Sequence, residues 1–277
     1  ALKILREKED NHKDIELSMV QKGPKAYSTA GWLGLSDKEI SETIKDMQAQ
    51  GFDCFKMKVG QNLDYDKERL AFIRSIIGSE SKLMLDCNQV WGVDEAISYM
   101  TELKEFNPVW IEEPTARDDV QGHIKISNAL KKFNIQVASG EQVPSPVIFK
   151  QLLQSNAIGF CQIDASRLGG VNDVMAVILL AKKFNIPVCP HGGGIGLCNM
   201  IVHYAIWDQV KVASHSKNQV VEYLEFLQDE VFVHPIEVKD GHYVTPKSYG
   251  WGLEMKNEFF NSHIYPTGDI WKDRVES

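Results

Sequence analysis

Titratable side chains recur along this sequence at intervals of about one strand-plus-helix unit. The series consists of Lys58, Asp86, Glu112, Glu141, Asp164, His191 and Glu222, with successive intervals of 28, 26, 29, 23, 27 and 31 residues. Each member lies at or near the end of a short apolar run. A single acidic residue in such a place is most often the cap of the following helix. Because caps need no common spacing, the series as a whole predicts a functional site at one edge of a parallel sheet.

Three carboxylates of this series, Asp86, Glu112 and Glu141, come from successive apolar runs. At one edge of a sheet they would crowd negative charge unless a cation lies between them. A set of oxygen ligands selects a hard ion, which favours Mg²⁺ and admits Mn²⁺. The trio contains neither cysteine nor histidine, which argues against zinc. The sequence therefore predicts a magnesium site.

Two acid–base groups are expected beside this metal. Lys56 and Lys58 are two positions apart on a strand and so point to one face. The positive charge of Lys56 would favour the neutral amine of Lys58, which makes Lys58 a usable base near neutral pH. Asp164 can hold one nitrogen of His191 and leave the other facing a substrate. This apparatus suits removal of a weakly acidic proton next to a carboxylate, with the metal stabilising the resulting charge.

Alternating elements position these residues. Apolar runs typical of strands cover 25–30, 53–59, 82–88, 108–114, 135–141, 158–164, 186–191 and 219–225, and amphipathic segments typical of helices cover 36–51, 64–78, 93–106, 119–133, 146–155, 171–184 and 199–210. Such alternation predicts parallel β/α units, either in a closed barrel or in a doubly wound sheet. The span of about 200 residues favours the barrel, whose active site lies at the carboxyl ends of the strands. No Gly-x-Gly-x-x-Gly motif follows the first strand.

Composition limits the partners and the compartment. Asp and Glu number 38 against 30 Lys and Arg, a net charge of −8, and no basic stripe suggests nucleic-acid binding. The five cysteines form no Cys-x-x-Cys pair, which indicates a reducing, cytoplasmic compartment. No apolar stretch approaches the roughly 18 residues of a membrane span, so no membrane association is expected.

The motifs around the series resemble the enolase superfamily, in its mandelate racemase subgroup, and are most similar to the L-fuconate dehydratases. These motifs are FKMKVG (55–60), LMLDCNQVW (83–91), WIEEPTARDD (110–119), ASGEQ (138–142), QIDASRLGG (162–170), CPHGGGIGLC (189–198) and VVEY (220–223). The resemblance implies an α/β fold of TIM type, a modified (β/α)7β barrel. A lysine or histidine base with Mg²⁺ is already known as the device of this superfamily.

Carried over residue by residue, the resemblance assigns the three carboxylates to Mg²⁺. It implies that Lys58, helped by Lys56, abstracts the proton next to a substrate carboxylate. His191, oriented by Asp164, would help the 3-hydroxyl group leave. Glu222, either protonated or strongly bridged, would hydrogen-bond the substrate carboxylate. An acid sugar such as L-fuconate would thus become a 2-keto-3-deoxy acid.

Further expectations concern substrate contacts and domains. The resemblance adds Asn88 to the substrate-binding residues, and the chain departs from the fuconate dehydratase pattern at Asn199, where that family has an acidic residue. The resemblance implies an amino-terminal capping domain, of which we expect this chain to carry only a small part. Residues 1–24 are expected to be the last helix leaving that cap, 25–224 the barrel, and 225–277 a segment that closes the barrel and returns toward the cap. We expect this chain alone to bind Mg²⁺ but to turn over acid sugars poorly.

Other functions remain open. A base on each side of the substrate also suits a racemase or epimerase of the same subgroup. A non-catalytic remnant without its cap is a second alternative, and a Schiff-base aldolase that uses Lys58 is a weaker one because it needs no carboxylate trio. The partner expected in every enzymatic case is a small acid sugar, and a homo-oligomer is expected.

Overall fold

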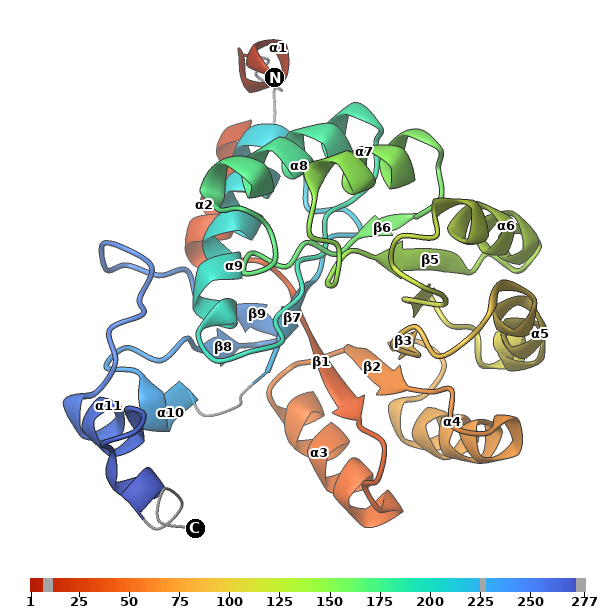
Figure 1. Ribbon diagram of the computed structural model, residues 1–277, viewed down its shortest axis with the longest axis horizontal. Coiled ribbons are helices and arrows are strands. Elements are labelled where there is room, and N and C mark those ends of the chain that lie inside the picture. Colours follow the sequence, from red (N-terminus) through yellow and green to blue (C-terminus); the bar gives the residue numbers. More distant parts are fainter. Residues whose placement is uncertain (7–11, 225–227, 273–277) are drawn as a thin grey trace.

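A curled parallel sheet with helices packed around its outside forms the centre of the computed structural model, which describes residues 1–6, 12–224 and 228–272 (Figure 1). Its strands are β1 (Ala26–Gly31), β2 (Cys54–Lys58), β3 (Lys82–Asp86), β4 (Trp110–Glu112), β5 (Gln136–Ser139), β6 (Phe160–Cys161) and β7 (Val221–Tyr223). The hydrogen-bonded order is β6-β5-β4-β3-β2-β1-β7, and every pair is parallel. Because the last strand pairs with the first, the sheet curls into the expected TIM-type barrel and is not doubly wound.

The seven expected barrel helices are all present. They are α3 (Asp37–Ala49), α4 (Leu63–Ile77), α5 (Val93–Leu103), α6 (Val120–Leu130), α7 (Pro146–Gln154), α8 (Val171–Lys183) and α9 (Leu197–Trp207). Local sequence explains where several of them begin. Ser36 and Glu39 form a capping box at α3, and the side chain of Asn62 caps α4. Ser145 caps α7, which has Pro146 in its first turn.

The expected strand at 186–191 is not a regular strand, and this part of the prediction was wrong. The segment makes one parallel bridge, between Val188 and Cys161. It still closes the barrel, because the backbone N–H of Cys161 donates to the carbonyl oxygen of Pro187 at 2.9 Å and that of Glu222 donates to Pro190 at 3.2 Å. Proline has no N–H group, so Pro187 and Pro190 interrupt the ladder of hydrogen bonds on this segment.

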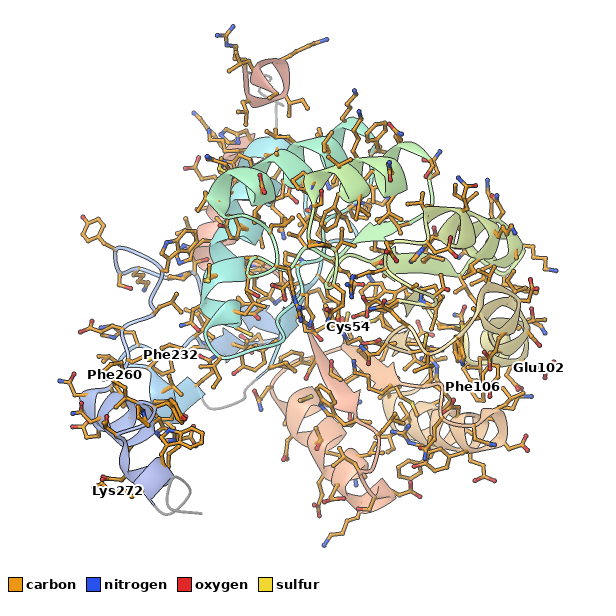
Figure 2. All side chains as sticks on the ribbon, in the orientation of Figure 1. Cys54, Glu102, Phe106, Phe232, Phe260 and Lys272 are labelled. Carbon is orange, nitrogen blue, oxygen red and sulfur yellow. The ribbon has the colours of Figure 1, made fainter. Side chains whose placement is uncertain are left out.

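Two layers of side chains fill the inside of the barrel. The lower layer, nearer the amino ends of the strands, is a buried cluster of Tyr27, Cys54, Met84, Trp110, Ala138, Phe160, Cys189 and Val220. Figure 2 places Cys54 near the middle of the barrel, whereas Glu102 and Phe106 lie at its outer edge. The upper layer lies two residues further along each segment and consists of Thr29, Lys56, Asp86, Glu112, Gly140, Gln162, His191 and Glu222. Side chains two positions apart on a strand face the same way, which produces the stacking.

The remaining elements lie around the barrel. They are α1 (Leu2–Arg6), α2 (His12–Gln21), η1 (Lys104–Phe106), η2 (Lys131–Phe133), η3 (Asp208–Val212), α10 (Gln228–Val231), β8 (Val238–Lys239), β9 (His242–Tyr243), α11 (Asn257–His263) and η4 (Asp269–Trp271). The antiparallel β8–β9 pair lies beside β1, where the N–H of Ala26 donates to Gly241 at 2.8 Å. The hydroxyl group of Tyr243 donates to the backbone carbonyl of Glu222. Within the described residues, no helix combines the length and the apolar character that a bilayer span requires.

Candidate active site

The three predicted metal ligands meet at the carboxyl ends of their strands. One carboxylate oxygen from each of Asp86, Glu112 and Glu141 lies within 4.8 Å of the others. Parallel pairing of β3 with β4 places Asp86 directly beside Glu112, and Glu141 follows the end of β5. All three side chains are buried. Three carboxylates at such distances, shielded from water, form a site of strongly negative potential.

The electrostatics of this cluster fit a hard divalent cation. Burial raises the pKa of Glu112 well above its usual range, and the charge of Asp86 raises it further. Oε2 of Glu141 is buried and accepts no hydrogen bond from the part of the chain that the structure describes, although it lies 3.2 Å from Nε2 of His191. An unsatisfied carboxylate oxygen within an all-oxygen donor set is what a Mg²⁺ ion would complete.

Lys56 lies at the centre of the upper layer. Its Nζ is 2.8 Å from Oε1 of Glu112, 2.8 Å from Oε1 of Glu222 and 3.4 Å from Oδ2 of Asp86, and its side chain is 1% exposed. Burial lowers the pKa of Lys56, but the carboxylates of Glu112 and Glu222 outweigh burial and raise it well above the usual value. Lys56 is therefore a charged group surrounded by negative charge. These carboxylates offset the repulsion that the sequence predicted between Lys56 and Lys58.

Lys58 occupies the more open side of the cluster. Its Nζ donates to Oδ2 of Asp86 at 2.5 Å and to Oδ1 of Asn88 at 2.7 Å, and its side chain is 12% exposed. The same ammonium group lies 5.3 Å from the centre of the Trp32 ring. Asn88, predicted to contact substrate, thus also holds Lys58 in place. Lys58 combines access to solvent with contact to a candidate metal ligand, as an acid–base group at such a site requires.

His191 and Asp164 form the predicted pair. Nδ1 of His191 lies 2.8 Å from Oδ2 of Asp164, whose Oδ1 accepts from the backbone N–H and the hydroxyl group of Ser166 at 2.7 and 2.6 Å. Nε2 of His191 faces the cluster, 3.2 Å from Glu141 and 3.7 Å from Glu222. Burial lowers the pKa of His191, but the bond to Asp164 and the charges of Glu222 and Glu141 together raise it.

Glu222 adopts the bridged form of the two alternatives that the sequence left open. Its Oε1 contacts Lys56 and accepts from the hydroxyl group of Thr29 at 2.9 Å, and its Oε2 accepts from the N–H of Gly192 at 3.0 Å. Burial raises the pKa of Glu222, but Lys56 and His191 outweigh it and hold the pKa far below the usual range. Glu222 is therefore ionised and compensated by Lys56.

Sequence reasoning missed two groups beside the cluster. Gln162 donates its Nε2 to Oε2 of Glu112 at 2.7 Å. Glu113, to which no role was assigned, is buried, and burial together with the charges of Glu141 and Asp86 raises its pKa to about 7. The two-residue strand period, counted back from Asp164, would have placed Gln162 inside the barrel. Glu113 has a backbone φ of 44°, which lies outside the range of a regular strand, so the two-residue strand period does not predict the direction of its side chain.

Asn199, the departure from the fuconate dehydratase pattern, lies outside this cluster of contacts. Its side chain is buried, and its Nδ2 donates to the carbonyl oxygen of Gly252 at 3.1 Å. The neighbouring Trp251 ring packs against His203 and Tyr204. Asn199 therefore anchors the carboxyl-terminal region to α9.

Comparison with known proteins agrees with this geometry. Residues 39–259 match the family described as enolase C-terminal domain-like. Mitochondrial enolase superfamily member 1 of Homo sapiens is 45% identical over 273 residues, which cover 98% of this chain and 61% of that protein. Its crystal structure superposes with a TM-score of 0.95 at 44% identity, covering 100% of this chain and 63% of that one.

Two named dehydratases are also similar. L-galactonate dehydratase of Hypocrea jecorina is 44% identical over 270 residues, which cover 96% of this chain and 59% of that protein. The structure of L-talarate dehydratase from Polaromonas sp. JS666, complexed with Mg and L-glucarate, superposes with a TM-score of 0.74 at 27% identity, covering 86% and 63% of the two chains.

The chain spans 61% and 59% of the two curated relatives that it matches here. Their names support the wider subgroup and do not single out L-fuconate dehydratase, which corrects the finer resemblance. The matched family, the superposition and the carboxylate cluster all describe one barrel domain. The chain belongs to the enolase superfamily, in its mandelate racemase/muconate lactonizing subgroup, and forms the barrel of the superfamily's carboxyl-terminal domain.

Proposed function

We propose that this chain is the catalytic barrel of a Mg²⁺-dependent acid-sugar dehydratase, whose metal site also accepts Mn²⁺. The observation that carries the proposal is the placement of two acid–base groups on two sides of one carboxylate cluster. Lys58 contacts Asp86 at 2.5 Å, and His191 lies 3.2 Å from Glu141. A proton acceptor and a proton donor at these places suit removal of the proton on C2 and departure of the hydroxyl group on C3.

The proposed reaction begins at Lys58. Its neutral amine takes the proton from C2, the carbon next to the substrate carboxylate, and the electron pair of the broken C–H bond moves into the carboxylate group to give an enediolate. When bound by Asp86, Glu112 and Glu141, Mg²⁺ supplies Lewis-acid stabilisation of the charge that develops on the substrate carboxylate. Asp86 and Asn88 hold the amine nitrogen in position, with contacts of 2.5 and 2.7 Å.

His191 completes the elimination. Asp164 fixes Nδ1, so Nε2 presents a proton to the hydroxyl group on C3. The electron pair of the enediolate then forms the C2–C3 double bond while the C3–O bond breaks with its own electron pair. The departing oxygen takes the proton from His191 and leaves as water, and the resulting enol becomes a 2-keto-3-deoxy acid. Glu222 contributes beside the substrate carboxylate as part of its pair with Lys56, whose ammonium group cancels the repulsion between two carboxylates.

Six-carbon acid sugars are the proposed substrates. The support comes from the named relatives, an L-galactonate dehydratase at 44% identity and an L-talarate dehydratase at 27%. L-fuconate is L-galactonate without its 6-hydroxyl group, so the two make a matched pair. We propose L-galactonate as the first compound to test and L-fuconate as the second. Comparison of their kcat/KM values measures what the 6-hydroxyl group contributes.

The decisive test is to incubate the Mg²⁺-loaded protein with these acid sugars and to measure the product. A dehydratase yields a 2-keto acid, which semicarbazide detects, and EDTA abolishes the signal. Lys58→Ala should lose the activity, whereas Lys150→Ala, an exposed lysine on α7, should keep it. Wild-type turnover in excess EDTA would overturn the magnesium assignment.

Epimerisation is the second candidate, because bases on two sides of a substrate can also exchange the same proton. The product distinguishes the two reactions. An epimerase in deuterium oxide incorporates deuterium at C2 and retains the 3-hydroxyl group, and semicarbazide then detects nothing. The non-catalytic alternative is tested by comparing this chain with a version that carries a full capping domain. If the capped version binds Mg²⁺ but performs neither reaction with any acid sugar, the non-catalytic alternative is supported.

A further inference from the structure

Arg69 is a buried cation on α4 to which the proposed reaction assigns no role. The residue is 3% exposed, and burial disfavours the charged guanidinium group and lowers the pKa of Arg69. Its Nη1 donates to the backbone carbonyl oxygen of Lys58 at 3.0 Å, and its Nη2 donates to those of Trp32 at 2.8 Å and Gly31 at 3.3 Å. One side chain of α4 thus joins the carboxyl end of β2, which carries Lys58, to the carboxyl end of β1.

These bonds lie where the pairing of β1 with β2 becomes irregular. Thr29 is opposite Lys56, but Gly31 is opposite Met57, so one residue of β1 bulges out of the register. A bulge disrupts the ladder locally and re-aims the side chains that follow it. Beyond the bulge, two carbonyls of β1 and the last carbonyl of β2 accept from one guanidinium group, whose planar fork of N–H donors suits several acceptors at once. Arg69 therefore connects the two strand ends where regular pairing stops.

The chain beyond the bulge brings Trp32 to the proposed base. The centre of the Trp32 ring lies 5.3 Å from Nζ of Lys58. The face of an aromatic ring attracts an ammonium group, and here it narrows the positions that the flexible stem of Lys58 can take. Trp32 is 44% exposed, so packing holds its ring only in part. The backbone of both residues is bound by Arg69, which therefore sets the separation between ring and ammonium group.

A neighbouring side chain of α4 fixes the turn that follows β2. Asp66 is buried, and its Oδ2 accepts from the backbone N–H of Gly60 at 2.7 Å. Gly60 has a φ of 104°, and an added Cβ would lie 2.6 Å from Cγ2 of Val90, so this close turn requires glycine. The chain is thus held by Arg69 at Lys58 itself and by Asp66 two residues later. Both contacts come from α4, which makes this helix the support of the proposed base.

We propose that Arg69 is a positioning residue for proton transfer at C2, which acts by holding the backbone of Lys58 and that of Trp32 at a fixed separation. The kinetic consequence rests on the proposed function, whereas the placement of Lys58 against Trp32 does not. Without Arg69 the two strand ends separate, and the amine of Lys58 spends less time within reach of C2. A misplacement of about 1 Å can cost about 100-fold in rate. The donors of Arg69 bind backbone carbonyls, so its loss should leave the carboxylate trio in place.

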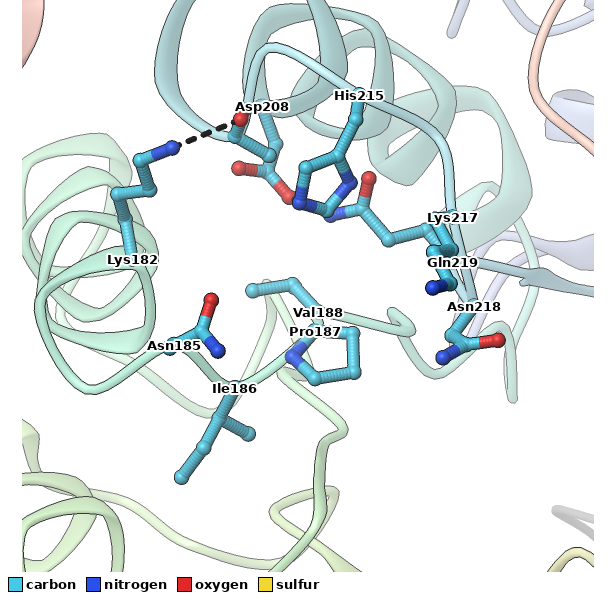
Figure 3. A pocket seen from close by; sticks show the side chains of 11 residues that line it. Lys182, Asn185, Ile186, Pro187, Val188, Asp208, His215, Lys217, Asn218 and Gln219 are labelled. Atoms are coloured by element: carbon cyan, nitrogen blue, oxygen red, sulfur yellow. Dashed lines mark hydrogen bonds between the residues drawn. The ribbon is translucent and has the colours of Figure 1, made fainter.

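Arg74 offers a matched control, because it is an arginine of the same helix that also binds backbone carbonyls. It donates to those of Ser81 at 2.8 Å and Phe106 at 2.9 Å. These contacts lie at the amino ends of the strands, as does the bond from Lys182 to the carbonyl of Ala213 at 2.8 Å (Figure 3). That end of a barrel serves stability, whereas active sites lie at the other end. Arg74→Met therefore measures what the loss of such a contact costs in stability alone.

The first test needs neither substrate nor metal and uses the NMR signals of lysine ε-methylene protons. The Trp32 ring should shift those of Lys58 upfield, and Lys58→Ala identifies them because they disappear. We expect the shift to vanish in Trp32→Leu and Arg69→Met and to remain in Arg74→Met. Arg69→Lys, which keeps the charge but not the fork of donors, should lose part of it and decides the matter if Arg69→Met fails to fold. The proposal is overturned if wild type lacks the shift, or if the folded Arg69 variants keep it in full.

The second test measures kinetics of the Mg²⁺-loaded protein with L-galactonate. Arg69→Met should lower kcat about 100-fold, and Arg69→Lys less, while KM and Mn²⁺ affinity stay close to wild type. In the His191→Asn background, exchange of the C2 proton with deuterium should fall by the same factor, because Lys58 alone carries it. An equal loss of kcat in Arg69→Met and Arg74→Met, at equal folded fraction, would show a purely structural role and overturn the proposal. Absence of turnover in wild type would refute the catalytic proposal, whereas the NMR shift still decides how Lys58 is held.

Discussion

The two layers inside the barrel come from the same segments, two residues apart, and differ in their physical character. In the lower layer, the Trp110 ring packs edge-on against Tyr27 at 5.7 Å and lies 4.8 Å from Phe160. In the upper layer, Lys56 lies 2.8 Å from each of two carboxylates. Buried apolar surface stabilises a fold, whereas buried ion pairs at best offset the cost of removing charge from water. We therefore expect the lower layer to carry stability and the upper layer to carry chemistry.

Direct contacts join the layers. Nε1 of Trp110 donates to Oε2 of Glu112 at 3.3 Å. Gln162, which donates to the same oxygen, lies 3.5 Å from the hydroxyl group of Tyr27. Apolar packing below thus holds donors that orient a candidate metal ligand above. A site that gathers like charges needs such rigid support.

The largest effect is expected from Glu112→Gln in the upper layer, which keeps the shape of the side chain but removes its charge. Lewis-acid stabilisation is worth several kcal/mol, so turnover should fall by about 1,000-fold or more, together with metal affinity. Turnover assays and Mn²⁺ binding by electron paramagnetic resonance measure the two. Glu102→Gln, which alters an exposed carboxylate 2.7 Å from Lys67, is the control. Undiminished metal affinity in Glu112→Gln would remove the basis for the site.

His191→Asn separates the two proton transfers of the upper layer. Loss of a general acid should slow elimination by about 100- to 10,000-fold. Lys58 remains, so exchange of the C2 proton with deuterium from solvent should continue and is measured by NMR. The exposed His234 provides a control as His234→Asn. If His191→Asn dehydrates at the wild-type rate, His191 does not assist the leaving group.

Trp110→Ala tests the lower layer. Removal of this buried ring should cost about 3–5 kcal/mol of unfolding free energy, measured with urea in the absence of metal. Trp110→Phe keeps most of the packing but loses the N–H group, so it should cost less stability while disturbing metal affinity through Glu112. Tyr249 is fully exposed, and Tyr249→Ala should change stability by less than about 0.5 kcal/mol. Equal stability of Trp110→Ala and Tyr249→Ala would refute the division of roles.

Asp208 extends the comparison to a buried carboxyl group outside both layers. The ammonium group of Lys56 lowers the pKa of Glu222. Burial instead raises the pKa of Asp208 from 3.8 to about 7. Between these values the folded protein holds a proton that the unfolded chain has lost, so stability falls as pH rises through this window and levels off above it. The loss is a few kcal/mol, since one unit corresponds to about 1.4 kcal/mol.

Asp208→Asn should remove this contribution. Urea unfolding at pH 4.5, 6 and 7.5 measures the free energy of unfolding. In Asp208→Asn this free energy should decline less with pH than in wild type, or should rise. The exposed pair of Lys272 and Asp269 offers the control Asp269→Asn, which should leave the slope almost unchanged. An unaltered slope in Asp208→Asn would show that this group does not titrate as its burial implies.

Much of the fold was predictable from local patterns. Apolar runs and capping residues such as Ser36 predicted the barrel helices, and the spacing of titratable residues indicated the strand ends. The segment at 186–191 was the exception, because its apolar character is that of a strand while Pro187 and Pro190 lack the N–H groups of a ladder. A hydrophobic pattern indicates that a segment is buried, but it does not indicate whether the backbone of that segment can form the hydrogen bonds of a strand.

The sequence by itself determined which residue types stand at the strand ends, since β/α repeats and the two-residue strand period are local properties. That was enough to propose the carboxylate trio and the pair of Asp164 and His191. Only the tertiary structure decided which side chains contact each other across the barrel. Thr29 and Glu222 are 193 residues apart in sequence, yet 2.9 Å separates their side-chain oxygens. Their meeting depends on the pairing of β1 with β7, and closure of a barrel is a property of the whole sheet.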